Sequence, residues 1–347
     1  MKLLKAAEIL IDKIKKDYKN DIACVVVMGS YVYNETHSRS DLDMYFVPKT
    51  ERGFNLQKVF LIDGIGFDFW AISWERLEGM ANHDERITSI ITEGKMLYYG
   101  SEEDLNRFNE IKAKALHVSD VEKFIGKAKE QVDTTYKKYF KLLNAGNISD
   151  ARKHAMGIIF SLTYAIALLN RTTVKRGRGK LKKEIMDMEL VPKDFATLYD
   201  TVFISNDIDM IRKAYGQLIR NTEDLIQMEH EKISKPVSFK DNVSGYYEEM
   251  INFYNKIYHS CEIGDKYTAL FATTELTMEF EGAFSVTEVS ANELPDIIGA
   301  YAPENIDTLL QLVHEHQRKI EGLLENHGVE VTVFKDFQEL EEYMKSL

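Results

Sequence analysis

Three acidic residues in the first fifth of the chain, Asp41, Asp43 and Asp68, have the spacing of a metal-binding site. Asp41 and Asp43 alternate with apolar residues in Ser-Asp-Leu-Asp-Met, and alternate residues of an extended strand share a face. Asp68 lies in a second apolar stretch, Gly-Phe-Asp-Phe-Trp, which predicts a neighbouring strand. Clustered carboxylates repel one another unless cations neutralise them, and magnesium binds carboxylate and phosphate oxygens. The three acids therefore predict a divalent-metal site with Asp41, Asp43 and Asp68 as ligands.

A Gly-Ser pair, Gly29–Ser30, ends the apolar run that precedes the acids. Because glycine has no Cβ, the backbone at Gly29 can approach a phosphate group closely, and the Ser30 hydroxyl can donate a hydrogen bond to it. Ser40, directly before Asp41, is a third candidate for nucleotide binding. The alternative interpretation of Gly29–Ser30 is a helix-capping turn.

The elements that must position these residues alternate between helix and strand patterns up to about residue 100. An amphipathic helix is expected over residues 3–18. Strands are expected over residues 22–28, 41–47, 65–72 and 96–99. Long helices follow, with capping-box-like starts at Ser101 and Ser119. Beyond Pro236 we expect helices over 246–260, 306–324 and 338–346, and a strand over 329–334.

These patterns predict an α+β protein in three parts. Residues 1–115 are expected to form a small mixed-sheet domain, residues 116–235 a helical-bundle domain that binds substrate, and residues 236–347 an acidic, mainly helical region with a short strand.

Composition restricts the class of protein. Of the 347 residues, 44% are hydrophobic and 29% charged, which is typical of globular proteins. No apolar run reaches membrane-spanning length, and the N-terminal segment lacks the apolar core of a signal peptide. Cys24 and Cys261 are too few for a disulfide framework. We therefore expect a cytoplasmic protein with no membrane partner.

The net charge of −12 is unevenly distributed. From residue 241 onward there are 21 acidic and 6 basic residues, whereas residues 1–240 are close to neutral. This charge argues against a nucleic-acid partner in the C-terminal region and favours a cationic one. The alternative is that its acidic helices are well-solvated surfaces.

The ordered set Gly29-Ser30, Ser40-Asp41-Leu42-Asp43 and Asp68 resembles the polymerase-β-type nucleotidyltransferase superfamily over roughly residues 20–100. The resemblance implies that an acceptor hydroxyl attacks the α-phosphorus of ATP and expels pyrophosphate. It also implies two Mg²⁺ ions held by Asp41 and Asp43, because two ions can stabilise both ends of the transferred group. For Asp68 it leaves two roles open, metal ligand or general base.

The helical remainder resembles the antibiotic nucleotidyltransferases, which adenylylate aminoglycosides or lincosamides. Three stretches, 165–171, 191–195 and 325–331, carry this looser similarity. In the kanamycin type a helical acid serves as base and a lysine four residues later holds phosphate, and Asp133 and Lys137 have that spacing. An ordinary solvated ion pair is the alternative. The choice between Asp68 and Asp133 as general base stays open.

The densest basic segment, residues 171–183, contains Gly177 and Gly179 and is expected to be a flexible loop. It either closes over the triphosphate or is a solvated loop. Near the acids, Arg39 is interpreted as a partner of a carboxylate, and His37 as an exposed turn residue.

Together these features predict an ATP-dependent nucleotidyltransferase that moves AMP onto a hydroxyl of a small polar acceptor. A cationic aminoglycoside is the leading acceptor, and antibiotic resistance would follow. The alternative is an antitoxin-like regulatory transferase that adenylylates a protein or RNA partner. A pseudoenzyme that only binds nucleotide is a third possibility, but all three acids of the motif are present.

Overall fold

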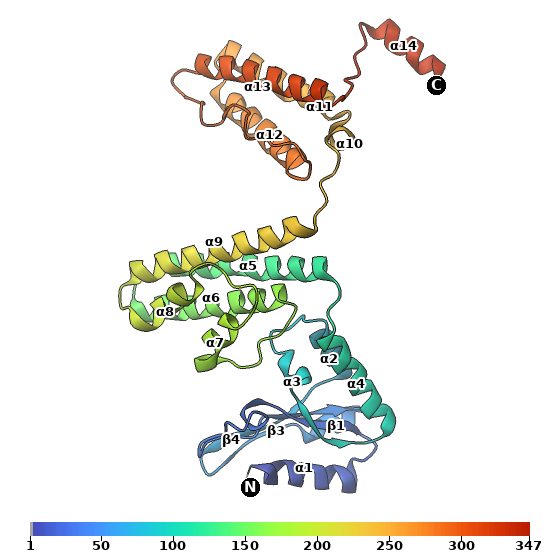
Figure 1. Ribbon diagram of the computed structural model, residues 1–347, viewed down its shortest axis with the longest axis vertical. Helices are drawn as coiled ribbons and strands as arrows, with labels where there is room; N and C mark the ends of the chain where they lie inside the picture. The colour runs from blue at the N-terminus through green and yellow to red at the C-terminus, as the bar shows by residue number, and fades with distance from the viewer. Residues whose placement is uncertain (1–2) are drawn as a thin grey trace. The chain divides into compact units, whose positions relative to one another are not determined.

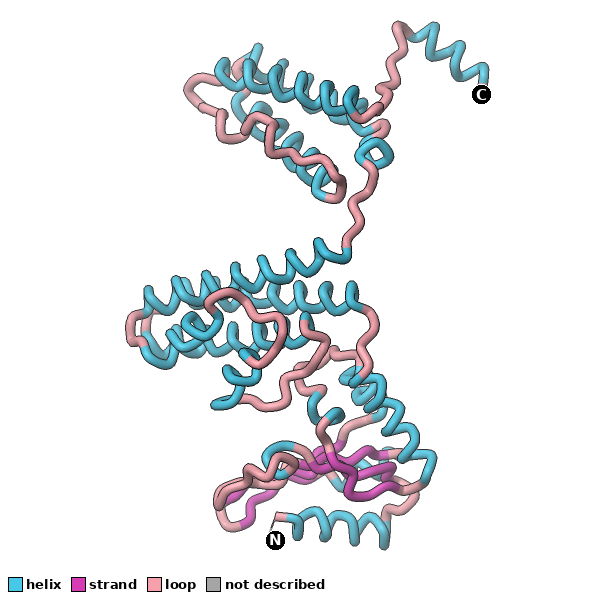
Figure 2. The backbone as a smooth tube through the Cα atoms, viewed as in Figure 1, coloured by secondary structure: helices cyan, strands magenta, loops and turns pink. Residues whose placement is uncertain are grey.

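The computed structural model describes residues 3–347, so Met1 and Lys2 of the expected 1–115 domain lie outside the described residues. The chain divides into two compact units, Met1–Ile233 and Ser234–Leu347. Figure 1 shows the order of the elements, and Figure 2 shows that the strands all lie near the N-terminal end of the chain.

Among the described residues, five strands form a mixed sheet in the order β3-β4-β2-β1-β5. Their bounds are β1 Ile22–Val27, β2 Met44–Pro48, β3 Lys58–Ile62, β4 Ile65–Ala71 and β5 Lys95–Tyr99. Strands β2 and β4 are parallel, and the other neighbours are antiparallel. Every residue of β1 and β2 is buried, as their continuous apolar sequences require for central strands.

Helices cover both faces of this sheet. Helix α1 (Leu4–Asp17) packs Leu10 and Ile14 against one face, which includes Val25 and Val27 of β1. Helices α2 (Trp74–Ala81), α3 (Ser89–Thr92) and α4 (Glu102–Leu116) pack against the other face. Ser101 caps α4, as expected, by accepting a hydrogen bond from the backbone N–H of Asp104. Short 3₁₀ helices, η1 (Gly29–Tyr31) and η2 (Glu51–Leu56), complete the domain.

The second part of this unit is a helical bundle. It comprises α5 (Val121–Leu143), α6 (Ile148–Leu169), η3 (Arg178–Lys180), α7 (Leu181–Met186), α8 (Phe195–Ile204) and α9 (Ile208–Ile233). Residues 161–169 of α6 are all buried, so α6 is the central helix. The cap of α5 is Asp120 rather than the expected Ser119, because the Asp120 carboxylate accepts from the Lys123 N–H. The mixed sheet followed by helices confirms the expected fold class.

The bundle is tied to the sheet domain by polar contacts. The Tyr164 hydroxyl of α6 donates a hydrogen bond of 2.7 Å to the main-chain oxygen of His83. Lys127 of α5 forms an ion pair of 2.5 Å with Asp84. These contacts fix the bundle, and with it the loop before α7, relative to the strands that carry the acids.

The unit Ser234–Leu347 is helical. Its elements are α10 (Phe239–Val243), α11 (Tyr246–Ile263), α12 (Lys266–Ser285), α13 (Asp307–Asn326) and α14 (Phe337–Ser346). The expected strand over 329–334 is wrong, because these residues have no regular secondary structure. A β-branched run forms a strand only where a neighbouring strand can pair with it, and none is described in this unit.

A search of the helices in the described residues finds none with the length and apolarity needed to cross a lipid bilayer.

Candidate active site

The acid pair comes from the segment that leads into β2. Leu42 and Met44 are buried in the core against α1, so the alternating Asp41 and Asp43 face the other side of the sheet. Strand β2 begins only at Met44, whereas the sequence predicted a strand from Asp41. Both carboxylates are half-buried.

Electrostatics at the pair are unfavourable without a cation. Burial and the neighbouring charge of Asp41 raise the pKa of Asp43, while Arg178 opposes this rise. A carboxylate whose ionised form is disfavoured in this way gains from a nearby positive charge. The pair therefore fits a divalent cation that completes its coordination with phosphate oxygens and water, as magnesium commonly does.

The backbone of Gly29 lies directly against the side chain of Asp43. Its φ of +68° lies in the left-handed region, and a Cβ at this position would be 2.0 Å from Asp43 Oδ2. The neighbouring Met28 N–H donates a 2.9 Å hydrogen bond to the Asp43 main-chain oxygen. Only glycine allows this approach, so the Gly-Ser turn and the acid pair are one structural unit.

Ser40 shapes the turn before the acids. Its buried hydroxyl accepts from the His37 N–H at 2.9 Å, and its own N–H donates to the His37 oxygen at 3.0 Å. The Arg39 N–H donates to His37 Nδ1 at 3.1 Å. Ser30, Ser40, His37 and Arg39 all line the pocket beside the acids.

Asp68 lies on the neighbouring strand and on the same face. Strands β2 and β4 are parallel, and Met44 is paired with Phe69. Asp43 comes directly before Met44 and Asp68 directly before Phe69, so the two acids lie at the same level of the sheet. Phe67 packs on the α1 side, which directs Asp68 to the side of the acid pair. Asp68 is exposed and does not line the pocket. Among the side chains that the structure describes, no three from His, Cys, Asp or Glu are grouped to hold a metal ion.

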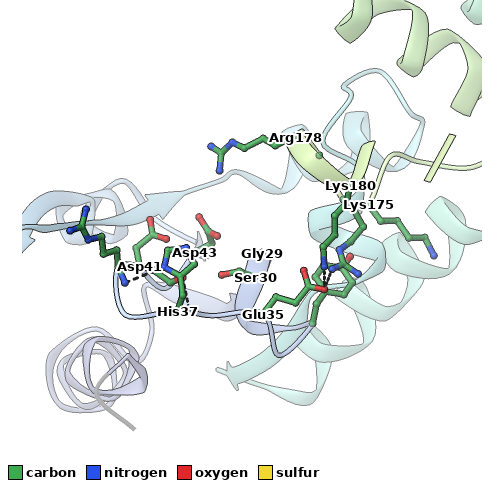
Figure 3. A pocket seen from close by; sticks show the side chains of 14 residues that line it. Gly29, Ser30, Glu35, His37, Asp41, Asp43, Lys175, Arg178 and Lys180 are labelled. Atoms are coloured by element: carbon green, nitrogen blue, oxygen red, sulfur yellow. Dashed lines mark hydrogen bonds and ion pairs between the residues drawn. The ribbon is translucent and has the colours of Figure 1, made fainter. Parts of the chain in front are cut away.

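The pocket beside the acids has a volume of about 610 Å³ and two walls. One wall is the segment from Gly29 to Asp43, and the other is the loop before α7. In Figure 3, Arg178 lies above Asp41 and Asp43, and Lys180 meets Glu35 across the pocket. The lining residues are Gly29, Ser30, Tyr33, Glu35, His37, Arg39, Ser40, Asp41, Asp43, Lys175, Arg176, Gly177, Arg178 and Lys180.

The loop of residues 175–180, here called the basic loop, is anchored at its base. The Glu184 carboxylate of α7 accepts hydrogen bonds from the backbone N–H groups of Lys175, at 2.5 Å, and Arg176, at 2.8 Å. Lys175 forms an ion pair of 3.1 Å with Glu93. The Arg176 guanidinium lies 4.1 Å from the centre of the Tyr33 ring, a cation–π contact.

Asp133 and Lys137 lie elsewhere. Both are exposed on α5, and neither lines this pocket. Tyr136, between them in sequence, donates a hydrogen bond to Glu223 of α9. The structure therefore brings Asp41 and Asp43 together with the basic loop, but not with Asp133 or Lys137.

Three acidic residues at this site, Glu35, Glu93 and Glu184, were not predicted from the sequence. Glu35 and Glu93 contact the basic loop from segments distant in the chain, and Glu184 contacts its backbone from the helix that follows. An isolated acid in a turn or on a helix has no local pattern that identifies its partner, so nothing in the sequence pointed to these residues.

Comparison with known proteins gives a family match for the helical bundle. Residues 105–232 match the family model of the KNTase C-terminal domain, the C-terminal domain of kanamycin nucleotidyltransferase. No curated protein matches the chain. A solved nucleotidyltransferase-like protein from Exiguobacterium sibiricum 255-15 is 11% identical, with a TM-score of 0.39, over 64% of this chain and 75% of that chain.

The chain is thus similar to the nucleotidyltransferases over residues 105–232, which make up less than half of its length. The family matched there is that of kanamycin nucleotidyltransferase, an aminoglycoside nucleotidyltransferase. Enzymes of this family generally use a nucleoside triphosphate and a divalent metal ion.

Proposed function

We propose that this enzyme transfers AMP from ATP to a hydroxyl group of a small polar acceptor. The observation that supports this most directly is that Asp41 and Asp43 share a pocket with the basic loop. A triphosphate between these two walls meets cations on one side and, on the other, carboxylates that favour a metal ion.

Each residue of the pocket is proposed to have its own role in nucleotidyl transfer. Asp41 and Asp43 are proposed to hold two Mg²⁺ ions, which, when bound, neutralise charge on the transferred group and on the leaving pyrophosphate. Gly29 lets the backbone approach the phosphates, and Ser30 and Ser40 offer hydroxyl groups. Arg178 forms no salt bridge within the described residues, so its charge is available to the triphosphate.

The helical segment 116–235 is proposed to bind the acceptor, and a cationic aminoglycoside is the first candidate. Purified full-length protein is incubated with ATP, Mg²⁺ and a panel of aminoglycosides and neutral polyols, and pyrophosphate release is measured. Release that requires one acceptor supports the proposal. If no small acceptor stimulates release while label from ATP appears on macromolecules, the proposal is wrong. We expect this activity in the cytoplasm, where the buried thiols of Cys24 and Cys261 stay reduced.

The edge strand β3 favours a second candidate, a regulatory transferase that adenylylates a protein. Val59 is paired with Asp68, so these side chains share a face, and Val59 is 71% exposed. Leu61, two residues along on the same face, is 75% exposed. An exposed apolar edge strand can pair with a peptide segment of a partner. Label from α-labelled ATP on a co-expressed protein, and not on small alcohols, would support this candidate.

Asp68→Asn is expected to lower kcat at least 100-fold, because loss of either a metal ligand or a general base costs about that much. If Asp68 is the base, the rise of kcat with pH disappears in the variant; if it is only a metal ligand, higher Mg²⁺ partly restores the rate. Asp63→Asn, in the adjacent exposed turn, is the matched control. Full activity of Asp68→Asn would exclude Asp68 from both roles.

Arg178→Ala is expected to raise the KM for ATP about 10- to 100-fold, the cost of losing one charged contact with phosphate. Steady-state pyrophosphate release at varied ATP measures it. Lys183→Ala is the control, because Lys183 is an exposed cation of α7 that pairs with Asp187 and does not line the pocket. An equal effect of the two substitutions would show that only general surface charge matters.

A further inference from the structure

Glu35 places a carboxylate inside the nucleotide pocket, against its cations. It lines the pocket and forms ion pairs with both Arg176 and Lys180 of the basic loop. These two cations hold the pKa of Glu35 below its usual range, so Glu35 is ionised at neutral pH. Figure 3 shows Lys180 beside Glu35, on the side of the pocket away from Asp41.

The basic loop does not need Glu35 to hold its position. Its backbone is anchored by Glu184, the Lys175 side chain is paired with Glu93, and Arg176 also rests on the Tyr33 ring. The side chains of Arg176, Glu35 and Lys180 are 26%, 34% and 55% exposed, and ion pairs that solvent reaches contribute little to stability, about 0–1 kcal/mol. Holding the basic loop in place therefore does not explain why two cations of the loop both pair with the Glu35 carboxylate.

A phosphate group would compete with this carboxylate. Both are anions with several acceptor oxygens, and both are bound by arginine and lysine in the same way. Arg176 and Lys180 cannot give their full charge to a ligand while Glu35 neutralises them. A ligand with more negative charge displaces Glu35 more readily than one with less.

We propose that Arg176 and Lys180 form the subsite for the terminal phosphates and that Glu35 is its internal competitor, which a triphosphate displaces and a monophosphate does not. The inference rests on the proposed function, because the subsite belongs to the nucleotide of that reaction. Glu35 thereby weakens binding of the terminal phosphates, and its return to the two cations favours release of pyrophosphate.

The experiment measures binding to full-length protein by calorimetry in the presence of Mg²⁺, with AMP, ADP, ATP and inorganic tripolyphosphate as probes. Glu35→Gln is expected to bind ATP and tripolyphosphate about tenfold more tightly than the unsubstituted protein, because one repulsive charge beside several phosphate charges is removed. ADP should gain less, and AMP should be almost unchanged. Glu35→Asp keeps the charge and should behave like the unsubstituted protein.

Glu93→Gln is the matched control, because Glu93 also pairs with a cation of the basic loop but does not line the pocket. It should not change ATP binding. The inference is overturned if Glu35→Gln binds ATP no more tightly, or if AMP gains as much as ATP. If tripolyphosphate follows the expected pattern but no nucleotide binds, the subsite stands and the proposed function fails. If neither binds to any variant, both fail.

Discussion

Asp43→Asn is expected to reduce nucleotidyl transfer by about a thousandfold or more, because it removes a proposed metal ligand whose stabilisation of charge supplies several kcal/mol. Pyrophosphate release under saturating ATP and acceptor measures the loss. The asparagine keeps the shape of the side chain, so Gly29 and Met28 keep their contacts with this position.

The same substitution should raise the melting temperature. The pKa of Asp43 is raised in the folded state, so the folded state binds this proton more tightly than the unfolded state does. The contribution to stability is therefore fully present below the unfolded pKa and is lost as pH rises through the folded pKa. At neutral pH the ionised Asp43 destabilises the fold, and asparagine removes that penalty.

Magnesium provides an independent test. It should raise the melting temperature of the unsubstituted protein more than that of Asp43→Asn, because the cation relieves the repulsion between Asp41 and Asp43. Asp187→Asn, an exposed acid of the bundle, is the control and should change neither activity nor the magnesium response. An active Asp43→Asn enzyme with an unchanged magnesium response would refute the metal assignment.

Gly29→Ala is expected to produce the second large effect, a loss of activity of about 100-fold or more with lower stability. The added Cβ would lie 2.0 Å from Asp43 Oδ2 and 2.8 Å from its Cγ, so the carboxylate must move. A misplacement of about 1 Å at a reacting centre can cost about 100-fold in rate. The positive φ adds strain of about 1 kcal/mol or more.

Gly64→Ala is the control that separates backbone strain at a positive φ from displacement of the Asp43 carboxylate. Gly64 has a φ of +74°, but a Cβ there meets no heavy atom within 4 Å. Both variants should lose stability in thermal melts, but only Gly29→Ala should lose activity. If the two lose activity equally, the approach of Asp43 to Gly29 has no special importance for catalysis.

Local patterns in the sequence were sufficient for much of the N-terminal domain. Alternating apolar residues around Asp41 and Asp43 identified which side chains face away from the core, and Ser101 had the pattern of a helix cap that it forms. The order of the Gly-Ser turn and the acids predicted the superfamily. These features depend on residues within a few positions of one another.

Local patterns failed where the outcome depends on a distant partner. Residues 329–334 have strand propensity but no strand beside them, and Asp133 and Lys137 share a helix face that does not reach the pocket. Whether the basic segment 171–183 is near the acids depends on how the bundle packs against the sheet domain, through contacts such as Tyr164 with His83.

The sequence by itself thus predicted the class of enzyme and the acid pair, because the strand period and the Gly-Ser turn are local properties of the chain. Only the tertiary structure decided which cations line the pocket with those acids, and that Glu35 forms ion pairs with two of these cations. Ion pairs between segments about 140 residues apart depend on the packing of two domains, and no spacing in the sequence encodes that.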